Sequence, residues 1–248
     1  MSLTGKVAVI TGGGSGIGRA TCLQIANDGA AVAVWDWNEP GAKETVDMIT
    51  KAGGRAIAVK VDVSSAEQVA AAAQRTRKDL GPITILVNNA AINYLISFLD
   101  ITEAQWDEMM KVNLKGPYIC VRTVIQDMLD AKWGRIVNIT SSSTQLGASR
   151  MAHYVASKGG LSGFTKALAS EFARSGITVN NVPPNFIETP LLRKTTTPES
   201  HKAAAEKSMM GHPGQPEDIA AAVSYLCSVA AKHINGHTLG VNGGNYMC

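Results

Sequence analysis

The segment Lys6–Arg19, KVAVITGGGSGIGR, decides the fold of this chain. Its first part, Lys6–Thr11, is a short apolar run rich in β-branched residues, which is typical of a strand buried on both faces. A glycine cluster follows directly, and a helical pattern begins at Ile17. Glycines lack a Cβ, so a turn of this kind lets a phosphate reach the backbone N–H groups at a helix N-terminus. The segment therefore predicts a strand, a phosphate-binding turn and a helix.

The alternation of short apolar runs with longer helix-period segments continues along the chain. The expected strands are Lys6–Thr11, Ala31–Asp36, Ala56–Val61, Ile83–Asn88, Arg135–Thr140, Thr178–Val182 and Thr238–Val241. The expected helices are Ile17–Asn27, Gly41–Lys51, Ala66–Leu80, Glu103–Asp130, Tyr154–Arg174 and Glu217–Val229. This order implies right-handed crossovers and helices on both faces of a parallel sheet. We predict one α/β domain over residues 1–248, with a doubly wound parallel sheet of about seven strands.

One segment, at about residues 186–214, interrupts this alternation. It is polar and Thr-rich, and it contains the run Glu188-Thr189-Pro190. An insertion of this length inside a compact domain is usually a lid or a binding loop. We expect it to cover the substrate.

The composition excludes several classes of protein. The 248 residues are 45% hydrophobic and 17% charged, a globular balance that a disordered chain does not have. The net charge of +3 is too small for the basic footprint of a nucleic-acid binder. No run of about 18 apolar residues predicts a membrane span, and the first residues show no leader pattern. We expect a cytoplasmic protein.

The cysteines do not predict a metal site or a disulfide framework. There are four, at positions 22, 120, 227 and 248. No two form a CxxC pair, and the neighbouring histidines fit no zinc spacing. Free thiols in a reducing compartment are the expectation.

The second expected strand ends in Asp36, eighteen residues after Gly18. A carboxylate at this place can accept hydrogen bonds from both hydroxyls of an adenosine ribose, and it repels a 2′-phosphate. The next residue, Trp37, is not basic. The sequence therefore predicts that NAD(H) is preferred over NADP(H).

Three motifs stand in order along the chain: TGGGSGIG at Thr11–Gly18, NNAA at Asn88–Ala91 and YVASK at Tyr154–Lys158. Together they resemble the short-chain dehydrogenase/reductase family, and the resemblance covers nearly the whole chain. It implies a single Rossmann-type domain, a nicotinamide cofactor and a homotetramer.

The resemblance also implies which residues hold the cofactor. They are Gly12, Ser15, Gly16, Ile17, Gly18, Asp36, Asp62, Val63, Asn89, Ala90, Tyr154, Lys158, Pro184, Ile187 and Thr189. Two positions depart from the family pattern, which usually has Gly where Ala91 and Pro184 stand here. Ala91 is expected to displace its turn slightly. Pro184 lacks an N–H and has a restricted φ, so the nicotinamide end of the site is expected to be shaped differently.

Four residues match the family's catalytic positions: Asn113, Ser141, Tyr154 and Lys158. Tyr154 and Lys158 are four apart on an expected helix and so share a face. The ammonium is expected to lower the phenol pKa from about 10 so that Tyr154 can exchange a proton with the substrate. Ser141 is expected to donate to the substrate oxygen, although Ser142 and Ser143 stay open as alternatives.

Two further residues belong to this region. The resemblance gives Asn113 the task of positioning a water that links Lys158 to solvent. His153 precedes Tyr154, and its side chain points elsewhere on the helix. We interpret His153 as structural or substrate-facing.

The substrate pocket is expected at the loops that follow the fourth, fifth and sixth strands. Its candidate residues are Asn93, Tyr94, Leu95, Gln145, Leu146, Phe186, Leu191 and Leu192. This set is largely apolar, so a hydrophobic, possibly cyclic, secondary alcohol and its ketone fit best. The alternative enzyme is a 3-oxoacyl-thioester (acyl-carrier-protein) reductase; such enzymes usually prefer NADPH, against which Asp36 argues. A non-catalytic NAD(H)-binding sensor would lack the tyrosine–lysine pair, which is present.

The expected assembly is a homotetramer in which two helices, Glu103–Asp130 and Tyr154–Arg174, pair across a two-fold axis. The second helix carries small residues that would let a partner helix approach closely: Ala156, Gly159, Gly160, Gly163 and Ala167. Small side chains on one helix allow a second helix to pack closely against it.

Overall fold

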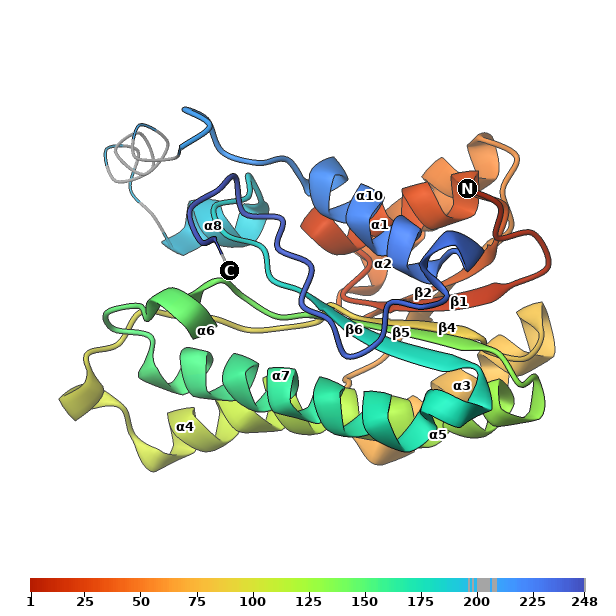
Figure 1. Cartoon of the computed structure of the whole chain (residues 1–248), viewed down its shortest axis with the longest axis horizontal. Helices are drawn as coiled ribbons and strands as arrows, with labels where there is room; N and C mark the ends of the chain where they lie inside the picture. Colours follow the sequence, from red (N-terminus) through yellow and green to blue (C-terminus); the bar gives the residue numbers. More distant parts are fainter. Residues whose placement is uncertain (196, 198, 200–205, 207–208, 248) are drawn as a thin grey trace.

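The glycine-rich segment lies at the centre of a parallel sheet of six strands, in a computed structural model that describes residues 1–195, 197, 199, 206 and 209–247 (Figure 1). The strands are β1 Val7–Thr11, β2 Ala31–Asp36, β3 Ala56–Lys60, β4 Ile85–Asn88, β5 Gly134–Ile139 and β6 Ile177–Val182. Their spatial order is β3-β2-β1-β4-β5-β6. The direction of winding reverses between β1 and β4, and ligands of such sheets bind at the carboxyl ends of the strands beside this reversal.

Helices cover both faces of the sheet (Figure 1). One face carries α1 Gly16–Asn27, α2 Glu39–Lys51 and α10 Pro216–Cys227. The other carries α3 Ala66–Leu80, α4 Glu103–Met110, α5 Gly116–Asp130 and α7 Ala152–Phe172. Shorter elements lie at the edges: α6 Ser143–Leu146, α8 Pro190–Thr195, and the 3-10 turns Phe98–Asp100, Ala173–Ser175 and Val229–Ala231.

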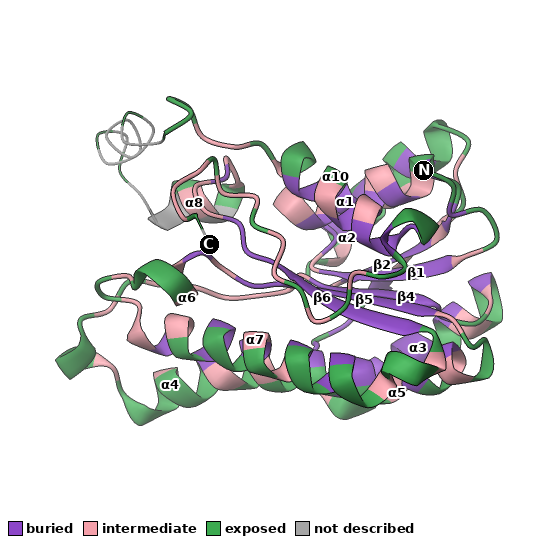
Figure 2. Cartoon of the chain, in the orientation of Figure 1, coloured by how far each residue is buried: buried purple, intermediate pink, exposed green. Residues whose placement is uncertain are grey.

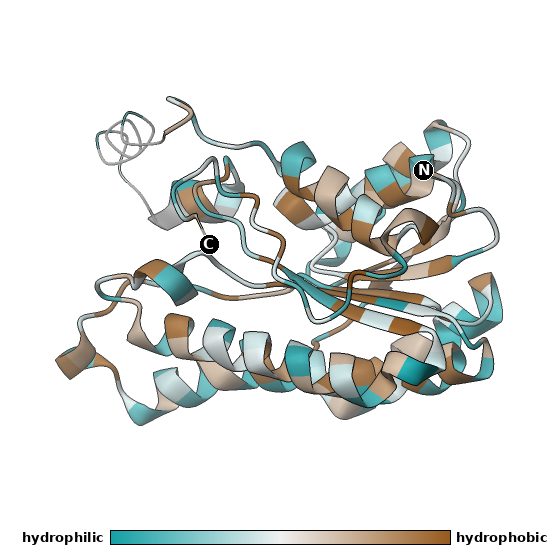
Figure 3. Ribbon diagram, in the orientation of Figure 1, coloured by the Kyte–Doolittle hydropathy of each residue, from teal (hydrophilic) through white to brown (hydrophobic). Residues whose placement is uncertain are grey.

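The core is divided by the sheet into two apolar clusters. In β1, Val7 and Val9 belong to the cluster that also contains Trp35, whereas Ala8 and Ile10 belong to the cluster under α1 and α10. Successive side chains of a strand point to opposite faces, so a strand with both faces covered is mostly apolar. Figure 2 shows the central strands of the sheet buried, and Figure 3 shows many apolar residues along them. The predicted doubly wound sheet is confirmed.

The predicted seventh strand, Thr238–Val241, does not form a named strand of the sheet. This segment runs beside β6 and makes isolated parallel bridges, Asn181 with Thr238 and Pro184 with Val241. Pro183 lies between these bridges and Pro184 makes the second one, and neither proline has an N–H to donate to a ladder. The expected count of about seven strands is therefore one too high.

The predicted helix Glu103–Asp130 is one continuous rod with a defect in it. It begins after Thr102, whose side chain and that of Gln105 form a reciprocal capping box. A π-helical turn, Lys111–Lys115, separates α4 from α5 and contains Asn113. Single π-turns inside helices are frequent at functional sites.

Part of the predicted lid, 186–214, can be described. Phe186 and Glu188 pair with Gly214 through backbone hydrogen bonds of 2.9 Å, which closes the base of the segment. Leu191 and Leu192 lie in α8. Residues 196, 198, 200–205, 207 and 208 lie outside the described residues. In the described part of the chain, the helices are too short or too polar to cross a membrane.

Candidate active site

The glycine-rich turn packs too closely for side chains. Gly12 has a φ of +66°, and a Cβ on Gly18 would collide with the carbonyl oxygen of Gly12. The turn leads directly into α1, which begins at Gly16 and has no acidic residue in its first turn. Ser15 precedes the helix, and its hydroxyl makes no capping hydrogen bond. The N–H groups and positive end of α1 are therefore suited to a pyrophosphate.

The end of β4 is tied to this turn by Thr11 and Asn89. The Thr11 hydroxyl accepts hydrogen bonds of 3.0 Å from the backbone N–H groups of Asn89 and Ala90. The Asn89 side-chain amide donates to the carbonyl oxygens of Thr11 and Gly12, at 2.9 and 3.1 Å. Asn89 and Ala90 therefore hold the turn in shape from the neighbouring strand.

Asp36 lies against the same turn at the end of β2. Its Oδ2 accepts from the backbone N–H of Gly14 and its Oδ1 from that of Asn38, both at 2.8 Å. These bonds fix the carboxylate, and each oxygen keeps a further acceptor position for a ribose hydroxyl. Trp37 beside it is 78% exposed. The register of β2 and β3 also places Lys60 next to Asp36, a cation that the motifs of the linear sequence do not indicate.

Asp62 and Val63 follow β3 on the same edge of the sheet. Asp62 is exposed, and its Oδ1 accepts from the backbone N–H of Ser64 at 2.8 Å. Val63 is buried in the core, where it lies close to Gly116 at the start of α5. Asp62 therefore presents a polar group at the edge, whereas Val63 anchors the loop beneath it.

Ser141 and Tyr154 are brought together from the end of β5 and the first turn of α7. The Ser141 hydroxyl interacts with the phenol of Tyr154 and lowers its pKa. Burial has the larger, opposite effect and raises the pKa of Tyr154 to about 12. We expected the phenol pKa to be lowered by Lys158. In the structure the phenol stays protonated over the whole neutral range, as a proton donor requires.

Lys158 is buried beside this pair, at 2% exposure. Its Nζ lies 5.8 Å from the centroid of the Tyr154 ring and donates a 2.8 Å hydrogen bond to the carbonyl oxygen of Ile139. Burial lowers the pKa of Lys158 to about 8. The ammonium is therefore held at a fixed point by the backbone of β5.

The three adjacent serines have different partners. Ser142 is buried, and its hydroxyl donates to the side-chain oxygen of Asn185 at 2.8 Å. The Ser143 hydroxyl lies 2.8 Å from that of Ser141, and either can be the donor. Of these three, Ser141 is the one whose hydroxyl influences the pKa of Tyr154. The geometry therefore favours Ser141 as the donor to a substrate oxygen.

Asn113 is placed at the site by the π-turn. Its amide clasps Ile92, accepting from the backbone N–H and donating to the carbonyl oxygen, both at 2.9 Å. It also donates to the Ser157 hydroxyl at 3.3 Å. Asn113 thus fixes the loop after β4 to α7. The water that Asn113 is expected to position between Lys158 and solvent stays a prediction.

The nicotinamide end of the predicted site is formed by the segment after β6. Pro184 is buried, and its carbonyl oxygen accepts from the backbone N–H of Ser142 at 3.0 Å. Ile187 is buried as well, at 6% exposure. Thr189 lies beside the glycine-rich turn, because a Cβ on Gly16 would stand 3.5 Å from its side chain. The predicted nicotinamide end therefore adjoins the predicted pyrophosphate site at the start of α1.

The predicted substrate residues divide into two groups. Leu95, Gln145 and Leu146 are exposed near the predicted active site, whereas Asn93, Tyr94, Phe186 and Leu192 are half-buried. The side chain of Leu191 lies outside the described part of the structure. The Tyr94 hydroxyl does not point freely into a pocket, because it donates to the Gln105 carbonyl and the Glu108 carboxylate of α4, each at 3.1 Å.

Within the described residues there is no cluster of three or more His, Cys, Asp or Glu side chains that could hold a metal ion. Cys22, Cys120 and Cys227 are buried free thiols. Burial raises the pKa of the Cys120 thiol to about 12, so it is protonated near neutrality.

The chain is similar to known oxidoreductases along its length. Residues 6–200 match the family model described as short chain dehydrogenase. The 3-oxoacyl-[acyl-carrier-protein] reductase FabG of Pseudomonas aeruginosa is 38% identical, with 100% of both chains covered. The (2S)-[(R)-hydroxy(phenyl)methyl]succinyl-CoA dehydrogenase subunit BbsD of Thauera aromatica is 36% identical, covering 100% of this chain and 99% of that protein. A crystal structure of levodione reductase has a TM-score of 0.93 at 28% identity, covering 97% of each chain.

Proposed function

Because the chain belongs to the short-chain dehydrogenase family of oxidoreductases, we propose that it reduces the ketone of a 3-oxoacyl thioester to a secondary alcohol, reversibly, with NAD(H). The observation that carries the chemistry is the contact of Ser141 and Tyr154 beside the buried ammonium of Lys158. This arrangement can donate to a carbonyl oxygen and deliver a proton to it.

Each side chain has one task in this reaction. The nicotinamide supplies the hydride when bound. Ser141 donates a hydrogen bond to the substrate oxygen, and the Tyr154 hydroxyl transfers its proton to that oxygen. The ammonium of Lys158 stabilises the phenolate that is left, while its bond to Ile139 keeps it in place. In alcohol oxidation the same groups act in reverse.

The preference for NAD(H) rests on Asp36. Its carboxylate is fixed against the glycine-rich turn, where it can accept from both ribose hydroxyls and repel a 2′-phosphate. Lys60 on the neighbouring strand carries a positive charge, which would attract a 2′-phosphate. We take Asp36 rather than Lys60 as the residue that selects the cofactor, because the glycine-rich turn fixes its carboxylate in place.

The thioester substrate is supported by the names of two full-length relatives. One reduces a 3-oxoacyl group on a carrier protein, and the other is a dehydrogenase subunit for a CoA thioester. A hydrophobic, possibly cyclic, ketone is the second candidate. The apolar side chains of Leu95 and Leu146 near the predicted active site and the similarity to a levodione reductase favour it.

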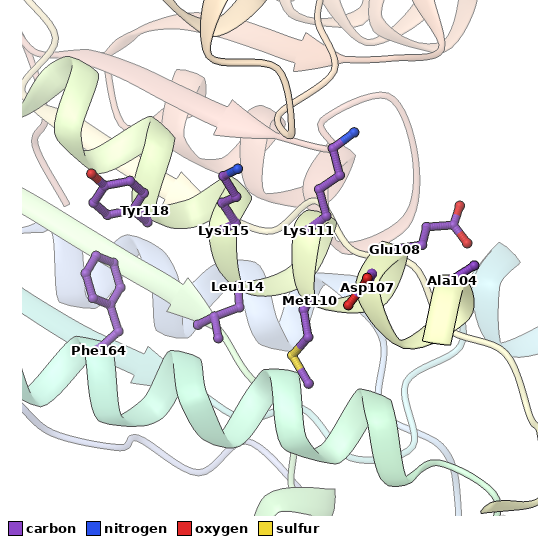
Figure 4. A pocket seen from close by; sticks show the side chains of 9 residues that line it. All are labelled: Ala104, Asp107, Glu108, Met110, Lys111, Leu114, Lys115, Tyr118 and Phe164. Carbon is purple, nitrogen blue, oxygen red and sulfur yellow. The ribbon is translucent and has the colours of Figure 1, made fainter. Parts of the chain in front are cut away.

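The homotetramer is supported by the outer face of α4, α5 and α7. A groove there is lined by Ala104, Asp107, Glu108, Met110, Lys111, Leu114, Lys115, Tyr118 and Phe164 (Figure 4). Acidic side chains lie at one end of this groove and lysines further along it. Antiparallel pairing across a two-fold axis would place the acids of one protomer opposite the lysines of another.

Two glycines of α7 support the same assembly. A Cβ on Gly159 or Gly163 would meet nothing within 4 Å, so packing within the chain does not require glycine at either position. Glycine in the middle of a helix costs about 1 kcal/mol relative to alanine. Gly160 differs, because a Cβ there would press on Leu114. Close contact with a helix of a second copy would account for glycine at the exposed positions 159 and 163.

The test is a comparison of substrates and cofactors with a matched variant. The purified chain and Tyr154→Phe are mixed with NADH or NADPH and either acetoacetyl-CoA or a panel of cyclic ketones, and the absorbance of the reduced nicotinamide is followed. We expect turnover of the thioester with NADH, lowered at least about 10²-fold in the variant. Turnover of cyclic ketones alone would select the second candidate. Binding of NADH without any turnover would favour the sensor.

A further inference from the structure

His153 is a buried imidazole next to Tyr154 that the proposed reaction does not use. It is 0% exposed, and neither ring nitrogen has a hydrogen-bond partner. Buried polar groups are usually paired, and an unpaired one is costly. Its position therefore needs a reason other than hydrogen bonding.

The ring of His153 packs on the ring of Tyr94. The two centroids are 5.1 Å apart and the planes are tilted by 56°. The hydroxyl of Tyr94 is held on the other side by the Gln105 carbonyl and the Glu108 carboxylate of α4. Tyr94 is thus fixed between α4 and the first turn of α7.

Tyr94 lies at the centre of a loop that is clamped on both sides of it. Ile92, before it, is clasped by Asn113 through its N–H and its carbonyl oxygen. Ile96, after it, donates its backbone N–H to the carbonyl oxygen of Arg150 at 2.9 Å. Between these clamps, the Tyr94 ring packs on His153 and its hydroxyl is hydrogen-bonded to α4.

From this arrangement we propose that His153 is a positioning residue. Its ring, through Tyr94, holds the substrate-side loop, residues 91–97, at a fixed distance from Tyr154. The inference rests on the proposed function, because the loop then sets where the substrate carbonyl lies relative to the Tyr154 hydroxyl. The ring acts by its shape, which explains why it needs no hydrogen-bond partner.

The ionisation of His153 agrees with this role. Burial lowers its pKa, so the ring is neutral at physiological pH. The ionisable groups around it are Tyr94, Glu108 beyond Tyr94, and Tyr154 and Lys158 on its own helix. Burial alone accounts for the shift of its pKa. In acid, once the ring takes up a proton, that proton would have no acceptor, and the contact with Tyr94 should loosen.

The experiment compares the full chain with His153→Ala, His153→Phe and Tyr94→Ala. The first readout is hydrogen–deuterium exchange of residues 91–97, which requires no substrate. The second is the KM of the ketone, measured with kcat and the Kd of NADH. Tyr94→Ala removes the same contact from the other side, so it tests the proposal even if His153→Ala does not fold.

We expect His153→Ala and Tyr94→Ala to speed exchange in residues 91–97 and to leave exchange in β1 unchanged. The KM should rise about tenfold while kcat and the Kd of NADH change little. His153→Phe keeps a ring and should resemble the wild type, without the rise in KM that protonation of the imidazole causes in acid.

Two results would overturn the proposal. One is unchanged exchange at residues 91–97 in both alanine variants. The other is a His153→Phe protein that behaves like His153→Ala, which would mean that the imidazole itself is needed. If the wild type reduces no ketone, the proposed function fails, but the exchange measurement still decides whether His153 positions the loop.

Discussion

The ammonium of Lys158 lies 5.8 Å from the centroid of the Tyr154 ring, and its hydrogen bond goes to the carbonyl oxygen of Ile139. The backbone of β5 therefore fixes the cation, and the tyrosine approaches it from the first turn of α7. Ser141 follows the same strand two residues later. One strand end thus positions both the cation and the serine relative to the phenol.

The pH dependence of ketone reduction should follow Lys158. Its pKa is lowered to about 8, so the ammonium is present below that pH and is lost above it. The Tyr154 phenol, with a pKa of about 12, stays protonated throughout this range. We expect kcat/KM for reduction to be level up to about pH 8 and to fall above it. An active Lys158→Arg variant should show the fall in kcat/KM at higher pH, because a guanidinium stays charged. A wild-type profile that stays level to pH 10 would contradict the assignment of the fall to Lys158.

Ser141 and Ser143 can be distinguished because they are adjacent and differ in their contact with Tyr154. Ser141→Ala removes a donor to the substrate oxygen and should lower kcat by about 10²–10³-fold. Ser143→Ala serves as the matched control and should change kcat by less than about fivefold. Steady-state kinetics with the same ketone measures both. Equal losses in the two variants would show that the pair acts as a unit.

Asp36→Asn should change the choice of cofactor. The amide keeps an oxygen that can accept from the turn, but it loses the negative charge that repels a 2′-phosphate. With Lys60 on the neighbouring strand, we expect the Kd of NADPH to fall about tenfold or more, equivalent to ~1.4 kcal/mol. Titration of nicotinamide fluorescence with NADH and NADPH gives both constants. An unchanged ratio of the two would remove Asp36 as the selector.

Gly163→Leu should disrupt assembly without harming the protomer. A side chain at this position enters open space in the single chain, and leucine is a better helix former than glycine. In a two-fold contact of α7 the same side chain would collide with the partner. Sedimentation velocity should show smaller species, with helix content retained. Lys51→Leu on α2 is the control, and a tetramer that persists in Gly163→Leu would place the interface elsewhere.

The sequence predicted the features that depend only on residues close together in the chain. The glycines from Gly12 to Gly18 and the acid Asp36 could be placed because a strand, a tight turn and a helix leave few alternatives. The pairing of Tyr154 with Lys158 follows from helical spacing. These residues do lie on one edge of the sheet, although the roles of the site residues remain predictions.

The remaining features depend on contacts between distant segments. The pKa of Tyr154 is raised rather than lowered, because burial by the surrounding fold exceeds the effect of nearby groups. The hydroxyl of Tyr94 is bound to α4, which no spacing rule indicates. The bridges near Pro184 do not extend into a seventh strand because prolines cannot donate to the ladder. Linear periodicity shows none of these effects.

The π-turn at Lys111–Lys115 determines the rotational phase between α4 and α5. One residue of an α-helix corresponds to about 100° of rotation. If the same residues continued as a regular α-helix, every later side chain of the rod would therefore point in a different direction. Tyr118 of α5, for example, would leave the outer groove. The extra residue held in the π-turn thus lets one continuous rod direct Asn113 towards the interior of the protomer and Tyr118 towards its outer surface.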